Sequence, residues 1–121
     1  MPGTVLVIDD EPETAEMIAV MIRLTGNEAI LSHGGTSAIT QIAKENPDVI
    51  ILDVMMPELS GLYLLRYIRR DPRLEHIPVI VVSALSRPED IQKGMQAGAE
   101  AYLTKPVAYR DLIAAVQKII A

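Results

Sequence analysis

The sequence predicts a doubly wound α/β sandwich, in which helices cover both faces of one parallel β-sheet. Short apolar runs rich in valine and isoleucine alternate with segments of helical periodicity along the 121 residues, and short connections join them. Parallel strands require crossover connections such as helices, and these crossovers are right-handed. The strand-like runs are apolar almost throughout, which is typical of strands buried on both faces. We therefore expect one (βα)5 domain of three layers that spans residues 1–121.

Each expected strand is a short apolar run that ends at polar or turn-forming residues. The run 5–8 stops at Asp9-Asp10, and the run 48–53 repeats this pattern by closing on Asp53. Pro78 opens the fourth run. The expected strands cover residues 5–8, 28–31, 48–53, 79–82 and 99–103.

Capping and helix-breaking residues mark the ends of the helices. Pro12 suits the first turn of a helix that Thr25-Gly26-Asn27 ends. Asn46-Pro47 ends the second helix and Asp71-Pro72 ends the third. The fourth begins at residues 86–89, after which Gly98 stops it, and the turn 34–37 supplies a cap for the second. The last helix carries one broad apolar stripe made by Tyr109, Leu112, Ile113, Val116 and Ile120.

Composition limits the functional classes that the chain can serve. Its 16 acidic and 11 basic residues leave a formal net charge of -5, which disfavours broad attraction to nucleic acid or to an anionic membrane. Cysteine is absent, so disulfides, thiolate metal sites and a cysteine nucleophile are excluded. The N-terminus does not resemble a signal peptide, and no apolar run has the length of a membrane span. We expect a cytoplasmic protein.

Acidic, hydroxyl and basic side chains follow the expected strands at one edge of the sheet. In doubly wound sheets the working site lies beyond the carboxyl ends of the strands. Three crowded carboxylates repel one another unless a hard cation with oxygen ligands lies between them, which favours Mg²⁺ (or Mn²⁺). A cation, an ammonium and a hydroxyl are the groups that phosphoryl transfer needs, and a carboxylate can act as its nucleophile. The residues in question are Asp9, Asp10, Asp53, Ser83 and Lys105.

Four motifs at these strand ends resemble the receiver domain of two-component response regulators. They are Asp9-Asp10, Asp53-x-x-Met56-Pro57-x-x-x-Gly61, Ser83-Ala84 and Lys105-Pro106. Each motif alone is weak, but four in this order on the correct strand ends are specific and span nearly the whole chain. The resemblance implies a flavodoxin-like fold, similar to that of chemotaxis regulators, with sheet order 2-1-3-4-5.

The resemblance also implies a role for each site residue. Asp53 would be the phosphoacceptor, and the lysine would pair first with its carboxylate and then with the phosphoryl group. Pro57 and Gly61 would serve backbone shape. The implied metal ligands are Asp10 directly, Asp9 largely through water, Asp53, and the backbone carbonyl of Met55; the implied phosphate ligands are Ser83 and Lys105; the implied switch residues are Ser83 and Tyr102; and the implied cis peptide joins Lys105 and Pro106.

The function implied by the resemblance is phosphorelay signal transduction. The phosphodonor would be a sensor histidine kinase, a histidine phosphotransfer protein or a small phosphodonor, and the chain would be a signalling phosphoprotein rather than an enzyme with a separate substrate. A homodimer through the fourth helix, fifth strand and fifth helix is a further expectation. Direct nucleic-acid or membrane binding by this domain is not expected. A stand-alone regulator and a module that controls an output domain both agree with the sequence.

Two side chains beside the expected phosphoacceptor bear on how long its phosphate lasts. In relatives with polar residues at these positions, a side chain can orient the hydrolytic water. Met55 and Leu85 cannot hold a water, so a long-lived phosphorylated form is expected. The alternative is that both side chains only pack and that water arrives from bulk solvent unaided.

Simpler interpretations stand beside these roles. A single acid at a strand end is usually a solvated loop residue, Ser83 could cap a turn, Lys105 could be an ordinary surface lysine, and Tyr102 could pack at a sheet edge. Met17, Val20 and Leu24 add apolar surface to the first helix, either as a kinase-docking face or as residues partly covered by loops.

Three rival functions fit less well. A haloacid dehalogenase-type phosphatase needs a second acid two residues after Asp53, where Met55 stands. A flavodoxin-like cofactor carrier would place a phosphate against residues 9–11, whose acids would repel it. A receiver that serves only as an unphosphorylated binding module has no support, because the complete phosphorylation set is present.

Overall fold

The computed structural model describes residues 3–34, 36–56 and 59–120. Strands and helices alternate regularly along the chain, as the sequence predicts. Most boundaries lie within two residues of the expected ones, because proline and glycine punctuate the chain strongly. The elements are β1 (Thr4–Ile8), α1 (Pro12–Arg23), β2 (Glu28–Ser32), α2 (Ser37–Glu45), β3 (Val49–Leu52), α3 (Gly61–Arg70), β4 (Val79–Ser83), α4 (Pro88–Gln96), β5 (Ala101–Thr104) and α5 (Tyr109–Ile119).

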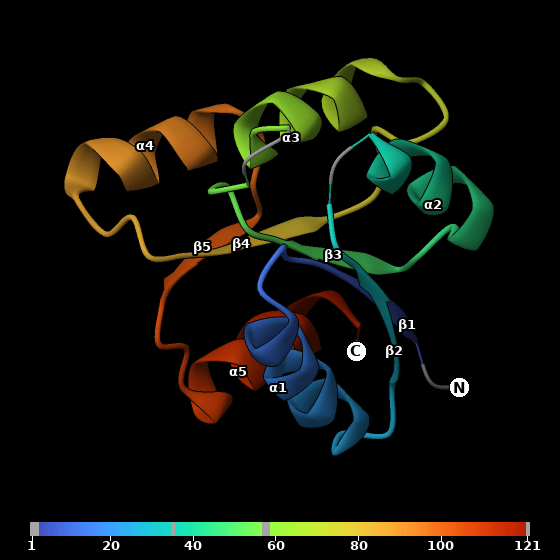
Figure 1. The fold of residues 1–121 in the computed structure, drawn as a ribbon, viewed down its shortest axis with the longest axis vertical. Helices are drawn as coiled ribbons and strands as arrows, with labels where there is room; N and C mark the ends of the chain where they lie inside the picture. The colour runs from blue at the N-terminus through green and yellow to red at the C-terminus, as the bar shows by residue number, and fades with distance from the viewer. Residues whose placement is uncertain (1–2, 35, 57–58, 121) are drawn as a thin grey trace.

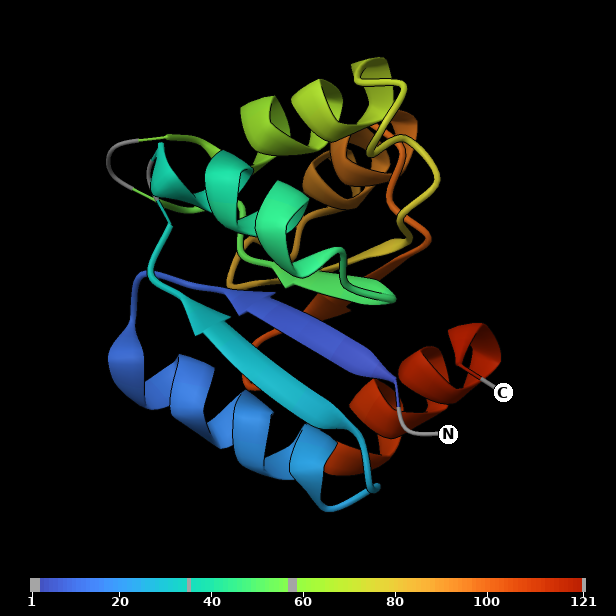
Figure 2. The ribbon, with the colours of Figure 1, turned by 90° about the vertical axis from the view of Figure 1, so that its right-hand side faces the viewer.

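All five strands form one parallel sheet in the order β2-β1-β3-β4-β5. Helices α1 and α5 cover one face of the sheet, and α2, α3 and α4 cover the other (Figure 1). Turned by 90°, the same three layers are visible with β1 and β2 in front (Figure 2). The predicted fold class and strand order are therefore confirmed.

Two apolar cores lie on the two faces of the sheet, because alternate side chains of each strand point in opposite directions. Leu6, Ile50 and Leu52 contribute to the core beneath α2 and α3. Val5, Val49 and Ile51, their neighbours along the strands, contribute to the core beneath α1 and α5. Among the described residues, no helix is long and apolar enough to cross a membrane.

Two boundary predictions need correction. The fifth strand begins at Ala101 and includes Thr104, because the N–H of Ala99 donates to the carbonyl of Gly94 and so belongs to the end of α4. Tyr109, which belongs to the apolar stripe expected on the last helix, is 44% exposed, since it occupies the first position of α5. The predicted turn before α2 includes Gly35, which lies outside the described residues.

Polar side chains also close the edge of the sheet where the strands begin. The Asp48 carboxylate accepts a hydrogen bond from the Thr4 N–H at 2.8 Å. On α3, the Arg69 guanidinium donates to the carbonyls of Gly98, Glu75 and Ile77 at 3.0, 3.1 and 2.7 Å. Each of these side chains is bonded to backbone atoms, so it ties loops together at this edge.

Candidate functional site

Strand ends place the predicted site residues at one edge of the sheet. Strand β1 pairs with β3 so that Ile8 lies opposite Leu52, which makes the next residues, Asp9 and Asp53, neighbours. The N–H of Asp53 donates to the carbonyl of Ile8 at 3.0 Å and holds this register past the strand ends. Ser83 ends β4, and the lysine follows β5 directly.

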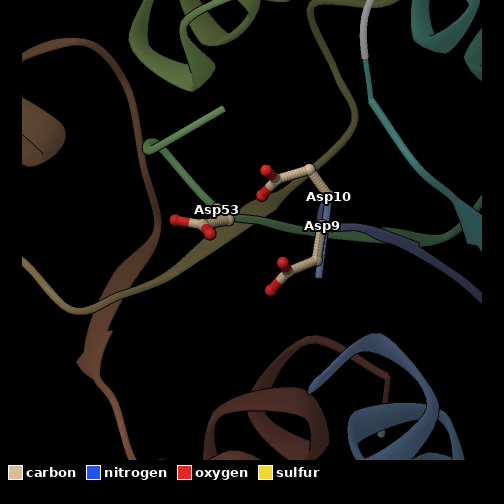
Figure 3. A group of neighbouring side chains, drawn as sticks. All are labelled: Asp9, Asp10 and Asp53. Carbon is tan, nitrogen blue, oxygen red and sulfur yellow. The ribbon is translucent and has the colours of Figure 1, made fainter. Parts of the chain in front are cut away.

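Three carboxylates converge at this edge. Each of Asp9, Asp10 and Asp53 offers one oxygen, and these oxygens lie within 4.8 Å of one another (Figure 3). Asp9 is 2% exposed and Asp53 is 3% exposed, whereas Asp10 is only half-buried. Like charges at this spacing and burial repel strongly, so the arrangement needs a counter-charge.

Lys105 supplies part of that charge. Its Nζ lies 3.0 Å from Asp9 Oδ2, 3.0 Å from Asp53 Oδ2 and 3.1 Å from Glu11 Oε1. Burial lowers the pKa of this lysine, but hydrogen bonds to the three carboxylates outweigh burial and raise the pKa above its ordinary value. The ammonium is therefore charged at any physiological pH, and it contacts the candidate phosphoacceptor directly.

The negative charge of Asp9, one of these carboxylates, is disfavoured by burial. Burial raises its pKa above the ordinary value of 3.8, and the Glu11 N–H and Lys105 offset only part of that effect. One lysine thus leaves the negative charge incompletely compensated. A divalent cation with oxygen ligands would supply the remainder, so the donor set and its electrostatics fit such an ion.

Backbone groups orient the carboxylates within the site. Asp53 Oδ1 accepts a hydrogen bond from the Met55 N–H at 3.0 Å, and Asp9 Oδ1 accepts one from the Glu11 N–H at 2.9 Å. In both residues the other oxygen contacts the lysine. The two side chains are therefore held in a defined orientation before any ligand arrives.

Gly61 has the structural role expected for it, for a different reason. It does not adopt a positive φ; instead, a Cβ at this position would overlap the backbone of Asp53 and Val54. The glycine allows α3 to begin against the loop that carries the phosphoacceptor candidate. Pro57, which was assigned a similar role, lies outside the described residues.

Ser83 and Tyr102 meet at the turn between β4 and α4. The buried Ser83 Oγ accepts a hydrogen bond from the Leu85 N–H at 3.2 Å, and the Tyr102 hydroxyl donates to the Leu85 carbonyl at 2.7 Å. Burial raises the pKa of the Tyr102 phenol above its ordinary value. Both candidate switch residues therefore bond to the backbone of Leu85, one to its N–H and the other to its carbonyl, although their predicted motion remains a prediction.

The remaining site predictions concern the peptide after Lys105 and the two flanking apolar side chains. The Lys105–Pro106 peptide is cis. Met55 is 52% exposed and Leu85 is 36% exposed, so both side chains reach solvent rather than being packed in the core. Met17 and Val20 of α1 are 42% and 47% exposed, and Leu24, directly after the helix, is 70% exposed, so all three side chains reach solvent.

Sequence reasoning missed two residues of the site. Glu11 was given no role, yet its carboxylate pairs with the lysine; the run of three acids, residues 9–11, was the available signal. Gly94 was also overlooked. A Cβ at Gly94 would lie 2.8 Å from Tyr102 Cδ2, so the glycine makes room for the tyrosine ring. No sequence pattern links these two residues.

The chain is similar to known proteins over nearly its whole length. Residues 5–117 match the family model described as the response regulator receiver domain. The chain is 35% identical over 117 residues to the phosphate regulon transcriptional regulatory protein PhoB of Pseudomonas aeruginosa, covering 97% of this chain and 51% of that protein. It is 31% identical over 120 residues to the polar-differentiation response regulator DivK of Brucella anthropi, covering 99% of this chain and 98% of that protein.

The structural comparison gives the same result. The receiver domain of the Francisella response regulator 1452 matches with a TM-score of 0.89 and 35% identity, covering 97% of this chain and 95% of that one. The chain spans about half the length of PhoB but nearly all of DivK. It has the sheet order of the receiver fold, and Asp9, Asp10 and Asp53 form an acidic cluster in it. The chain belongs to the response regulator receiver domain family, and its function is two-component signal transduction.

Proposed function

We propose that Asp53 is the phosphoacceptor of this receiver domain and that residues 1–121 form one such domain. The contact between Asp53 Oδ2 and Lys105 Nζ at 3.0 Å, at the centre of the acidic cluster, carries the proposal. The Asp53 carboxylate is nearly inaccessible to bulk water and is paired with the Lys105 ammonium, an arrangement that suits a carboxylate nucleophile.

The proposed reaction transfers a phosphoryl group from a phosphohistidine. A carboxylate oxygen of Asp53 forms a bond to phosphorus, and the phosphorus–nitrogen bond breaks. The imidazole leaves with the bonding electron pair and takes up a proton. Lys105 contacts the Asp53 carboxylate and would then pair with a phosphoryl oxygen after the transfer. The buried Ser83 hydroxyl would donate a hydrogen bond to another phosphoryl oxygen.

We propose Mg²⁺ or Mn²⁺ as the cofactor of the reaction. Four carboxylates, those of Asp9, Asp10, Glu11 and Asp53, face one ammonium at this edge. The ion would be held by Asp10, by Asp9 largely through water, by Asp53 and by the Met55 carbonyl. When bound, it neutralises the charge on the transferred phosphoryl group.

The proposed phosphodonor is a sensor histidine kinase or a histidine phosphotransfer protein. A shallow groove of about 320 Å³ lies beside the site and is lined by α1 and the segment after Lys105. The exposed apolar side chains of Met17 and Val20 on α1, and of Leu24 directly after it, extend this surface. An apolar surface next to the acceptor carboxylate suits a donor protein that must bring its phosphohistidine to Asp53. We place this signalling in the cytoplasm.

Phosphorylation would act on the turn held by Ser83 and Tyr102, and through it on the face formed by α4, β5 and α5. That face is the proposed homodimer surface. The acids Glu89 and Asp90 of α4 already pair with Arg87 at 3.2 and 3.5 Å, so they would contribute little to pairing between subunits. Equal sedimentation with and without beryllofluoride would argue against the dimer.

The proposal is tested by incubating the chain with acetyl phosphate and Mg²⁺ and measuring its intact mass. One added phosphoryl group that hydroxylamine removes is expected, because an acyl phosphate is labile to that nucleophile. Asp53→Asn should abolish the addition, whereas Asp111→Asn, an exposed aspartate of α5, should be labelled normally. Equal labelling of Asp53→Asn and the wild type would overturn the assignment.

A further inference from the structure

A second concave surface lies on α3, away from the acidic cluster. It has a volume of about 520 Å³ and is lined by Tyr63, Arg66, Tyr67, Arg70, Asp71 and Pro72. Helix α3 begins against the backbone of Asp53, so Arg70 lies about 13 Å further along the helix axis. The groove therefore belongs to the outer layer that contains α2, α3 and α4 (Figure 1), and it shares no residue with the phosphorylation site.

Two tyrosines supply the aromatic part of this groove. Tyr63 and Tyr67 are one helical turn apart and so lie on the same side of α3. Tyr67 packs partly against the core, which fixes its ring, whereas Tyr63 is 59% exposed. A large aromatic side chain left mostly in solvent next to a fixed one is a common feature of protein interaction surfaces.

Two arginines supply its charge. Arg66 and Arg70 are also one turn apart, and both are exposed. Neither has an ion-pair or hydrogen-bond partner for its guanidinium among the residues that the structure describes. Asp71, at the rim, is already engaged by the Arg73 guanidinium at 3.0 Å, and that hydrogen bond lowers the pKa of Asp71. The groove is thus cationic on a chain whose net charge is -5.

Arg69, a third arginine of α3, differs from Arg66 and Arg70 in its hydrogen-bond partners. On the same helix, its guanidinium is bonded to three backbone carbonyls and serves the fold. The two arginines of the groove make no such bonds among the described residues, so local structure does not account for them. Arginine and tyrosine together recognise carboxylates and apolar or aromatic side chains at once, through paired hydrogen bonds and stacking.

We propose that this groove, defined by Tyr63, Arg66, Tyr67 and Arg70, docks an acidic peptide segment of a partner protein that also carries an aromatic side chain. Charge complementarity selects an acidic ligand. A small molecule is a poorer fit, because one helix and one turn cannot enclose it and Tyr63 stays largely exposed. Nucleic acid is disfavoured by the net charge of the chain and by the presence of only two arginines in the groove.

The test uses fluorescence anisotropy of the full chain with a labelled synthetic peptide of alternating aspartate and glutamate that contains one phenylalanine. Saturable, salt-sensitive binding is expected. Arg66→Gln with Arg70→Gln should weaken it about tenfold or more, and Tyr63→Ala about fivefold. The matched control removes two exposed cations elsewhere, Lys93→Gln with Arg110→Gln, and should change the affinity less than about twofold.

No phosphodonor or Mg²⁺ is present in this experiment, so its outcome is independent of the proposed phosphorylation. Absence of saturable binding, or an equal loss in the control pair, would overturn the proposal. Equal binding of a peptide with glutamine and asparagine in place of the acids would do the same, because charge selection would be lost. If an oligothymidylate bound more tightly than the peptide and its binding depended on the same two arginines, the proposal would be overturned, and the ligand of the groove would be a nucleic acid.

Discussion

Polar side chains lie at both ends of the β-sheet, and their partners differ. Where the strands end, Asp9, Glu11 and Asp53 share one lysine, while the other oxygens of the two aspartates accept backbone N–H groups. Where the strands begin, Asp48 and Arg69 are bonded to backbone atoms. Backbone partners cannot be exchanged without moving a strand or loop, whereas a lysine shared by several carboxylates can change partner when an ion or a phosphoryl group arrives. One end is therefore suited to chemistry and the other to stability.

The largest effect is expected for the metal at the carboxyl end. Asp10→Ala removes the ligand that we propose to hold Mg²⁺ directly, and it should weaken Mg²⁺ binding by about 100-fold or more, as measured by titration calorimetry. Asp48→Asn, which neutralises a carboxylate at the opposite end, is the matched control and should keep wild-type affinity. Similar losses in both variants would remove the distinction between the two ends.

Arg69→Met should act on stability alone. It leaves three carbonyls without their donor, and about 2 kcal/mol of unfolding free energy should be lost in urea denaturation. Arg66→Met changes the same residue type on the exposed side of α3 and should cost less than about 0.5 kcal/mol. Mg²⁺ affinity should stay unchanged in both variants; a drop in Arg69→Met would mean that the two ends are coupled.

Dephosphorylation tests whether water is positioned at the carboxyl end. Met55→Asn with Leu85→Glu supplies side chains that can orient a water, and a hydrogen bond of about 1 to 3 kcal/mol corresponds to roughly 5- to 150-fold faster loss of phosphate. The two single variants separate the contributions. Phosphate loss is followed by intact mass with Mg²⁺ present and the donor removed. A double variant that keeps its phosphate as long as the wild type would show that positioned water is not limiting.

The smallest effect concerns the charge of Asp9. Its raised pKa means that its contribution to stability is fully present below the ordinary value of 3.8 and is lost as pH rises through the raised value. Asp9→Asn should therefore stabilise the metal-free fold at neutral pH by about 1 kcal/mol, and the gain should shrink toward acid. Urea denaturation across the pH range measures it; a gain that grows toward acid would have the wrong sign.

Much of the site could be predicted because of the topology alone. Apolar runs closed by acids placed Asp9, Asp10 and Asp53 at strand ends, and a parallel sheet brings the carboxyl ends of its strands to one edge. The contacts of individual side chains were less accessible. Nothing in the sequence links Gly94 to the Tyr102 ring, and the run of acids at residues 9–11 does not say which of them contacts the Lys105 ammonium.

The sequence by itself determined the layers, the strand order through its family resemblance, and the edge at which the acids meet. Hydrophobic periodicity reports how one residue faces its own element, which is sufficient for the layers but not for the strand order. Only the tertiary structure decided that Lys105 is shared by three carboxylates, that Arg69 ties loops together while Arg66 and Arg70 line a groove, and that β5 begins at Ala101. These features depend on how helices and loops cross in space, because side chains far apart in the sequence meet only after the layers have packed.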